Sequence, residues 1–161
     1  MIVVADSSPL VALVNIGHID VLPGLFGQVF IPPQISAELI QSKRPQRVRD
    51  FIASGPNWLR ELVPLAFQPI AFLHAGEVAA ISLAEQLRAD LLLIDEVRGR
   101  RIAAERRIPF AGTIGVLELA ADQDLLDLRQ AFESLKKTDF WVSRALLDER
   151  LKLYISRKGS T

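Results

Sequence analysis

The feature of this sequence that most constrains its fold is a series of short, entirely apolar runs. Residues 2–5, 29–31 and 91–94 are the clearest of these runs, and each is too short to form a helix. A strand without polar alternation is typical of a parallel sheet, because helices then cover both of its faces. The runs alternate with segments of helical spacing. We therefore expect an α/β fold, a three-layer α/β/α sandwich with a mainly parallel central sheet.

The remaining segments complete this alternation. Residues 59–63 and 108–111 are weaker strand candidates. Ser8 is a good N-cap and Gly17 a good C-cap for a first helix. The chain is mostly helical by pattern from Thr113 onward. Helical spacing is also expected in the following segments: 20–25, 34–41, 48–52, 76–87, 97–107, 127–136 and 143–153.

The composition limits the classes of protein to which the chain can belong. Its 161 residues are enough for one domain with a proper core, and we expect a single domain over residues 1–156 with a frayed tail at 157–161. No apolar run reaches the roughly 18 residues of a membrane-spanning helix, and the N-terminus lacks the positive region of a secretory signal. The sequence holds no cysteine, which excludes disulfides and thiolate metal sites. We expect a cytoplasmic protein without membrane contact.

The charge balance argues against a protein that coats nucleic acid. Lysine and arginine total 19, as do aspartate and glutamate, so the formal net charge is zero. Proteins that coat nucleic acid usually carry a basic excess. Any contact with nucleic acid is therefore expected to be local. Basic residues concentrate in two segments, 43–49 and 98–107.

Four carboxylates stand at positions that packing explains poorly. Asp6 and Asp95 each end an apolar run, so both should emerge from the same edge of a parallel sheet. Glu77 heads a helical stripe that should be buried, and Glu38 lies on a short helix. Taken singly, each has an ordinary structural explanation as a cap, a favourable charge at a helix N-terminus or a solvated charge. Gathered at one edge, the carboxylates would raise one another's pKa unless a cation neutralised them, and carboxylates favour a hard ion such as Mg²⁺ or Mn²⁺.

At these residues the sequence resembles the PIN-domain family. The resemblance is carried by Glu38 and by the segments VVADSSPLVAL, HAGEVAAISLA, LLLIDEVRGRRIAAE and GTIGVL. It runs from Ile2 to about Leu119, with a looser match in the C-terminal helices. The closest similarity is to prokaryotic PIN-like proteins related to the toxin ribonucleases of type II toxin–antitoxin systems (VapC-like).

This resemblance implies a function and a site. PIN domains are metal-dependent ribonucleases with a three-layer sandwich, and their acids correspond here to Asp6, Glu38, Glu77 and Asp95. These residues are expected to be catalytic, to hold one or two Mg²⁺ or Mn²⁺ ions, and so to promote hydrolysis of RNA phosphodiester bonds. Ser7 matches the small hydroxyl residue beside the first acid. The resemblance also implies that the protein is the toxin of a toxin–antitoxin pair, with an antitoxin protein as partner.

Two positions depart from the family pattern. The third acid is usually Asp but is Glu77 here, and the hydroxyl residue before the fourth acid is replaced by Ile94. These changes leave a second interpretation open, in which a degenerate PIN-like domain binds RNA or a protein without cleaving. Retention of metal binding by the acids would separate the two interpretations.

Other side chains are candidates for substrate contact. Arginine binds phosphate through its forked guanidinium, so Arg98 and Arg101, shortly after Asp95, are expected near the substrate. Ser7 and Thr113 are also expected there, although Thr113 has the alternative role of capping its helix. Glu96 and Arg100, four residues apart, are expected to form a surface pair.

Aromatic residues, histidines and apolar helices are assigned structural roles. Trp58 and Trp141 are expected in the core or at an interface rather than as platforms for base stacking. His18 and His74 lack the spacing of metal ligands. The C-terminal helices are richer in apolar positions than one small domain needs, so we expect a homodimer.

Other α/β classes with acids at strand ends fit less well. A receiver domain needs an acidic pair after the first strand, and a phosphatase of the haloacid dehalogenase type needs Asp-x-Asp. The sequence Asp6-Ser7-Ser8 supplies neither. No glycine-rich phosphate loop follows the first apolar run, which argues against a nucleotide-binding domain.

Overall fold

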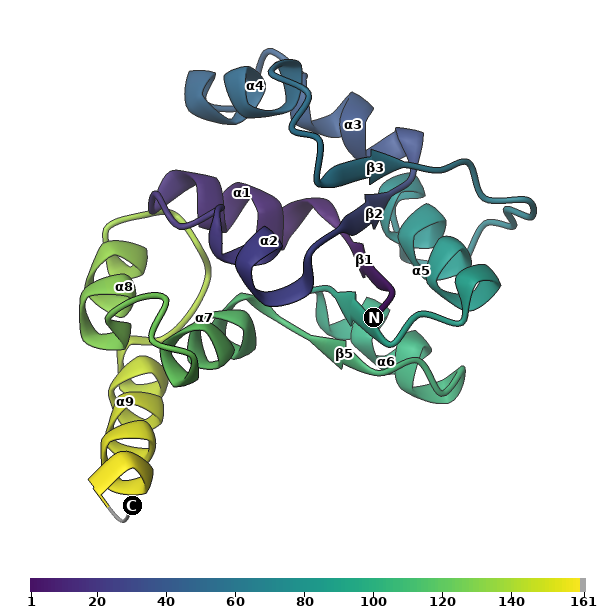
Figure 1. Ribbon diagram of the computed structural model, residues 1–161. Coiled ribbons are helices and arrows are strands. Elements are labelled where there is room, and N and C mark those ends of the chain that lie inside the picture. The colour runs from purple at the N-terminus through teal and green to yellow at the C-terminus, as the bar shows by residue number, and fades with distance from the viewer. Residues whose placement is uncertain (160–161) are drawn as a thin grey trace.

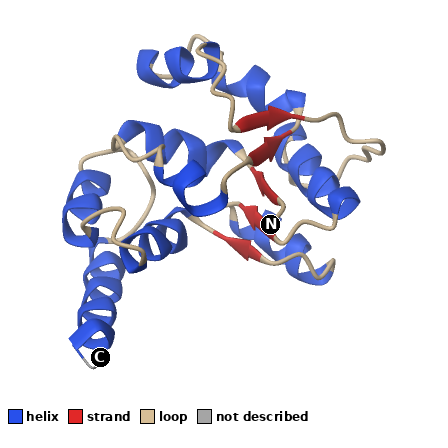
Figure 2. Ribbon diagram, in the orientation of Figure 1, coloured by secondary structure: helices blue, strands red, loops and turns tan. Residues whose placement is uncertain are grey.

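The computed structural model describes residues 1–159 and contains a five-stranded sheet flanked by helices (Figures 1 and 2). The strands are β1 (Val3–Ala5), β2 (Val29–Ile31), β3 (Leu59–Glu61), β4 (Leu91–Leu93) and β5 (Phe110–Ala111). The helices are α1 (Ser7–Asn15), α2 (Val21–Phe26), α3 (Pro33–Leu39), α4 (Gln46–Ala53), α5 (Ala75–Leu87), α6 (Val97–Glu105), α7 (Thr113–Asp122), α8 (Leu128–Lys136) and α9 (Arg144–Gly159). Each predicted strand and helix is present. Within residues 1–159, no helix has the length and apolar character needed to cross a membrane.

The sheet is parallel throughout and has the strand order β3-β2-β1-β4-β5. In the central pair, Val3 lies opposite Leu91 and Ala5 opposite Leu93. The chain extends the sheet in one direction from β1 through β2 to β3, and in the other direction from β4 to β5. The order therefore reverses between β1 and β4. In open α/β sheets, ligands bind at this reversal, beyond the carboxyl ends of the strands.

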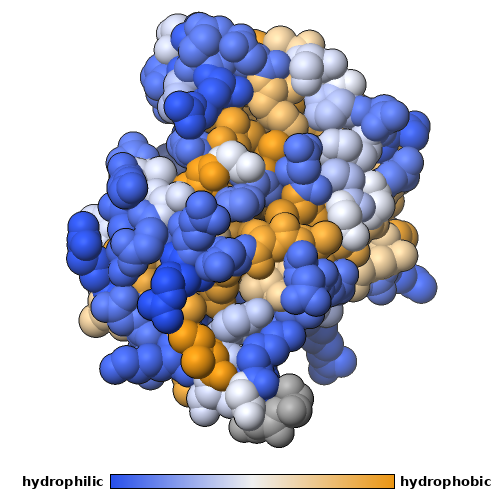
Figure 3. Space-filling model, turned by 60° about the vertical axis from the view of Figure 1, so that its left-hand side comes forward, coloured by the Kyte–Doolittle hydropathy of each residue, from blue (hydrophilic) through white to orange (hydrophobic). Residues whose placement is uncertain are grey.

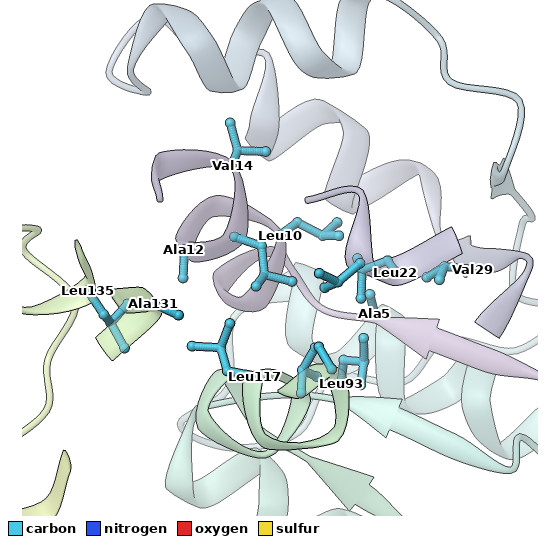
Figure 4. Close-up of a cluster of buried hydrophobic side chains, with 14 of the residues drawn as sticks. Ala5, Leu10, Ala12, Val14, Leu22, Val29, Leu93, Leu117, Ala131 and Leu135 are labelled. Atoms are coloured by element: carbon cyan, nitrogen blue, oxygen red, sulfur yellow. The ribbon is translucent and has the colours of Figure 1, made fainter. Parts of the chain in front are cut away.

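Alternate residues of the central strands point into two separate hydrophobic cores. Ala5 and Leu93 belong to the core on the side of α1, α2 and α7, where Figure 4 shows them close to Leu10 of α1. Val4 and Leu92 belong to the opposite core, on the side of α5 and α6. Because both faces of the strands are covered, both need apolar residues. The predicted three-layer α/β/α sandwich is confirmed.

The first and last helices differ from their predicted bounds. The N-cap of α1 is Asp6 rather than Ser8, so the helix begins directly after the first acid. At the other end, α9 continues to Gly159, whereas residues 157–161 were expected to form a frayed tail. The Arg157 guanidinium lies 3.0 Å from the Asp122 carboxylate, an ion pair that ties the last turn of α9 to the end of α7. Residues 160 and 161 lie outside the described part of the chain.

The two tryptophans have different environments. Trp58 is half-buried and packs against Phe51, with 5.9 Å between the ring centroids, as expected of a core residue. Trp141 is 96% exposed, which excludes the core and leaves an interface as the other expected placement. Leu153 and Ile155 of α9 are also about half exposed. Viewed with the α8 and α9 side turned forward, hydrophobic side chains form a broken band among hydrophilic ones (Figure 3).

Candidate functional site

Asp6 lies at the carboxyl end of β1, next to β4. Its backbone N–H donates a hydrogen bond of 2.9 Å to the carbonyl of Leu93, which extends the pairing of the two strands by one residue. Asp6 is the N-cap of α1, but its side chain makes no capping hydrogen bond. Among the described residues, its buried Oδ1 atom has no hydrogen-bond partner. Burying an unpartnered carboxylate oxygen is unfavourable, so this oxygen is a natural ligand for something that the chain itself does not supply.

Asp95 emerges from the same edge, two residues beyond β4, and its position is fixed by three hydrogen bonds. The hydroxyls of Ser8 and Thr113 donate to Oδ2 at 2.9 and 2.7 Å, and the backbone N–H of Thr113 donates to Oδ1 at 2.7 Å. Thr113 begins α7, so the carboxylate also lies at the positive end of a helix dipole. A Cβ atom on Gly112 would lie 2.7 Å from Oδ1, so glycine is needed here for Asp95 to reach α7.

Glu77 and Glu38 approach this edge from helices α5 and α3. Glu77 occupies the first turn of α5, where its Oε2 accepts a hydrogen bond of 3.3 Å from the backbone N–H of His74. The expected apolar stripe that follows it along α5 is buried. Glu38 packs so closely against the backbone of Gly76 that a Cβ atom there would overlap its Oε1. The absence of a side chain at Gly76 thus brings Glu38 next to Glu77.

Burial and charge together perturb Asp6 strongly. Desolvation is the largest cause that raises the pKa of Asp6 above 3.8, and a hydrogen bond from the backbone N–H of Ser7 lowers it. The negative charges of Glu77, Glu38 and Asp95 also raise it, in that order, and all these effects together bring the pKa to about 7. The four predicted acids therefore act on one another electrostatically. In the absence of a cation, these effects favour the protonated form of Asp6 at pH values where a free aspartate is ionised.

Glu77 is also perturbed, and its main electrostatic neighbour is an acid that sequence reasoning missed. Desolvation raises the pKa of Glu77, and a hydrogen bond from the backbone N–H of His74 lowers it. The charge of Glu96 raises it further, as does that of Glu38. Rather than pairing with Arg100, Glu96 accepts a 2.7 Å hydrogen bond from the backbone N–H of Gly99 and so caps α6.

Asp6, Glu77, Asp95 and Glu96 border a cavity of about 800 Å³, whereas Glu38 does not. It is lined by residues of the sheet edge, of α1, of the start of α6 and of the segment between α8 and α9, among them Asp6, Ser7, Ser8, Arg44, Glu77, Asp95, Glu96, Arg100, Trp141 and Leu146. The cations at this cavity are thus Arg44 and Arg100. Both are half-buried, and in both the Nε atom is buried without a hydrogen-bond partner among the described residues.

The other predicted substrate residues do not border the cavity. Arg98 and Arg101 are exposed on α6, with the Arg98 guanidinium 5.0 Å from the centre of the Phe72 ring, and neither borders the cavity. Thr113 is fully buried and contacts Asp95. Ile94, which replaces the hydroxyl residue of the family pattern, belongs to the core beneath α5 and α6, so its side chain leaves the cavity open.

The donor chemistry of the site fits a hard divalent cation. As the side chains stand, no three His, Cys, Asp or Glu residues in positions 1–159 form a ready metal-binding group. Even so, the carboxylates supply oxygen donors alone, and Asp6 has an unpartnered buried oxygen. A cation would compensate the desolvation of ionised Asp6 and its repulsion by the other acids, the effects that raise its pKa. Asp6, Glu38, Glu77 and Asp95 would hold such an ion.

Comparison with known proteins gives one result. Neither the curated proteins nor the solved structures include a significant match to this chain. A family model for a PIN domain matches residues 2–156, nearly the whole chain, in agreement with the parallel sandwich and its acidic edge. The chain therefore belongs to the PIN-domain family.

Proposed function

We propose that this protein is a metal-dependent endoribonuclease that hydrolyses RNA phosphodiester bonds. PIN domains are generally nucleases that use divalent metal ions. The observation that carries the proposal is the buried, unpartnered Asp6 oxygen, surrounded by the charges of Glu77, Glu38 and Asp95. Such an arrangement costs stability unless a cation is bound, so it is better explained by cation binding than by structure.

The acids of this chain would have different roles at the site. Asp95 is fixed by Ser8 and Thr113 and offers a carboxylate whose position changes little. Burial and the neighbouring carboxylates raise the pKa of Asp6 to about 7, so a cation held there would favour its ionised form. Mg²⁺ or Mn²⁺, held by these acids together with Glu38 and Glu77, would lower the pKa of a bound water and offset negative charge on the phosphate.

The arginines would contact the RNA backbone at two distances from the acids. Arg100 lies close to Asp95, since a Cβ atom on Gly112 would be within 3.6 Å of its guanidinium and 2.7 Å of the Asp95 Oδ1. We propose that Arg100 and Arg44 bind the phosphate at the cleavage site. Arg98 and Arg101, exposed on the same helix as Arg100, would contact phosphates outside the cavity.

We also propose partners, which rest on the family resemblance and on α9. The protein would act in the cytoplasm as the toxin of a toxin–antitoxin pair, inhibited by an antitoxin protein. The half-exposed apolar residues of α9, including Leu153 and Ile155, would form part of a homodimer interface. Light scattering at high micromolar concentration should give the mass of a dimer, and a monomeric mass would contradict this interface.

The ribonuclease proposal is tested by cleavage of a panel of single-stranded RNAs with Mg²⁺, Mn²⁺ or EDTA. Cleavage should require the metal and should be lost in Asp95→Asn, while Asp20→Asn, which alters an exposed carboxylate, should retain it. Arg100→Ala should lower kcat, whereas Arg101→Ala should raise KM and weaken its dependence on salt. Full activity in EDTA, or unchanged activity in Asp95→Asn, would exclude the mechanism. An inactive parent that binds RNA would favour the non-cleaving binding domain.

A further inference from the structure

The exposed tryptophan lies beside the proposed catalytic site. Trp141 belongs to the segment between α8 and α9, which lies beside α1 (Figure 1). It borders the same cavity as Asp6 and Asp95, yet its side chain is 96% exposed. A large aromatic side chain is usually mostly buried in a folded protein. At the mouth of this cavity, the indole offers both an edge and a face to a ligand.

The segment that carries Trp141 is anchored on both sides. The Thr138 hydroxyl donates a 2.7 Å hydrogen bond to the carbonyl of Leu135 and accepts one of 3.2 Å from the backbone N–H of Phe140. Phe140 and Val142 both pack against the core beneath α1 and α7. The side chains of residues 140–142 thus point inward, outward and inward, and the contacts of the two partly buried neighbours keep the indole on the outside. Ordering it on a ligand would therefore cost little additional entropy.

We propose that Trp141 is a stacking platform for an unpaired base of the RNA next to the cleaved phosphate. This inference rests on the proposed function, because it takes the occupant of the cavity to be RNA. A single strand alternates bases with phosphates, and this cavity offers an indole together with the guanidinium groups of Arg44 and Arg100. A base within a duplex has no free face, so the platform selects single-stranded RNA.

The chain allows a direct spectroscopic test. It contains two tryptophans, so Trp58→Phe leaves Trp141 as the single indole fluorophore. Asp6→Asn removes a proposed metal ligand and should prevent cleavage, so hexauridylate and hexaadenylate are titrated into the Trp58→Phe, Asp6→Asn variant in the presence of Mg²⁺. Stacking should quench the Trp141 emission in a saturable manner. The same oligonucleotides with abasic sites should bind roughly tenfold more weakly and quench little.

Substitutions at Trp141 measure the contribution of stacking. By fluorescence anisotropy with labelled RNA, Trp141→Ala should weaken binding roughly tenfold, and Trp141→Phe, which keeps an aromatic face, should restore most of the affinity. Leu65→Ala is the matched control, since Leu65 is 89% exposed but borders a different cavity. In the cleaving parent background, Trp141→Ala should raise KM more than it lowers kcat.

The outcomes separate this inference from the ribonuclease proposal. Unquenched emission on RNA binding, or equal affinity in Trp141→Ala, would overturn the stacking role even if the parent cleaves RNA. A change of mass in Trp141→Ala without a change in RNA affinity would instead identify a protein contact and would also overturn it. Binding with quenching but no cleavage in the parent would support the platform and contradict the ribonuclease. A parent that binds none of the oligonucleotides would contradict both.

Discussion

Replacing Asp6 by asparagine should stabilise the metal-free protein at alkaline pH, even though it removes a carboxylate from the proposed catalytic site. Asn is nearly isosteric with Asp but carries no charge. In the folded protein, desolvation and the charges of Glu77, Glu38 and Asp95 oppose ionisation of Asp6 and raise its pKa to about 7. In the unfolded chain these effects are absent. Ionised Asp6 therefore lowers the free energy of unfolding, and Asn avoids that loss.

The size and pH range follow from the two pKa values. Because the pKa of this acid is raised on folding, the folded state binds more protons than the unfolded state between about pH 4 and pH 7. Stability from this group therefore falls as pH rises through that range and is constant above it. The change from 3.8 to about 7 corresponds to about 4 kcal/mol at 1.36 kcal/mol per tenfold change in proton affinity. A buried amide without a partner costs about 1–3 kcal/mol, so the net gain at pH 8 is about 1–3 kcal/mol.

The assay is urea denaturation in EDTA at pH 5, 6.5 and 8, for the parent, Asp6→Asn and the exposed control Asp20→Asn. The advantage of Asp6→Asn over the parent should grow by about 2–3 kcal/mol from pH 5 to pH 8, and that of Asp20→Asn should not. The cost of the buried amide is the same at every pH, so it drops out when the advantage of Asp6→Asn is compared between pH values. The change with pH is therefore the decisive measurement. An advantage that does not grow with pH would refute the electrostatic account of this site.

Three further predictions concern the surroundings of the site and the ion. Gly76→Ala should displace the Glu38 carboxylate, because the new Cβ atom would occupy its position. Activity assays should show slower cleavage, and urea denaturation should show a change in the free energy of unfolding of less than about 1 kcal/mol. The buried Glu118 carboxylate accepts hydrogen bonds of 2.6 and 3.2 Å from two guanidinium nitrogens of Arg150 and so joins α7 to α9. Glu118→Gln should therefore lower the free energy of unfolding by about 1–2 kcal/mol in urea denaturation. In a scanning fluorimetry titration, Mg²⁺ should raise the melting temperature of the parent. At one hundred times its Kd, the stabilisation should be about 2.7 kcal/mol. The same Mg²⁺ concentration should stabilise the protein less at pH 5, because protons compete with the ion for the carboxylates.

The sequence was sufficient to predict the sheet and the acids at its edge. Unbroken apolar runs indicate strands covered on both faces, and parallel pairing of β1 with β4 then brings Asp6 and Asp95 to one edge. The position of Glu77 followed from the stripe below it, which is buried as predicted. These inferences succeed because they depend on local periodicity and on the common direction of parallel strands.

Contacts between distant segments could not be predicted in the same way. On α6, Arg98 and Arg100 are about 200° apart around the helix axis at 100° per residue, so only one of them can face the cavity. Which of them faces the cavity depends on how α6 packs against the sheet and on where the cavity lies, neither of which local spacing gives. Ser8 was assigned to capping α1, and its bond to Asp95 depends on how α1 lies over β4. The exposure of Trp141 depends in the same way on which of its neighbours reach the core.

The four acids differ in how firmly they are held, and this difference bears on how the site would be filled. Asp95 has hydrogen bonds at both oxygens, whereas Asp6 has an oxygen without a partner among the described residues. The site therefore combines Asp95, whose position is fixed, with Asp6, whose ionised form is unfavourable until a proton or a cation neutralises it. A proton does so near pH 7, and a divalent cation would compete with it for the same oxygens. The cluster therefore reduces the stability of the fold, and its chemistry explains its presence, because well-packed apolar residues would stabilise the fold better.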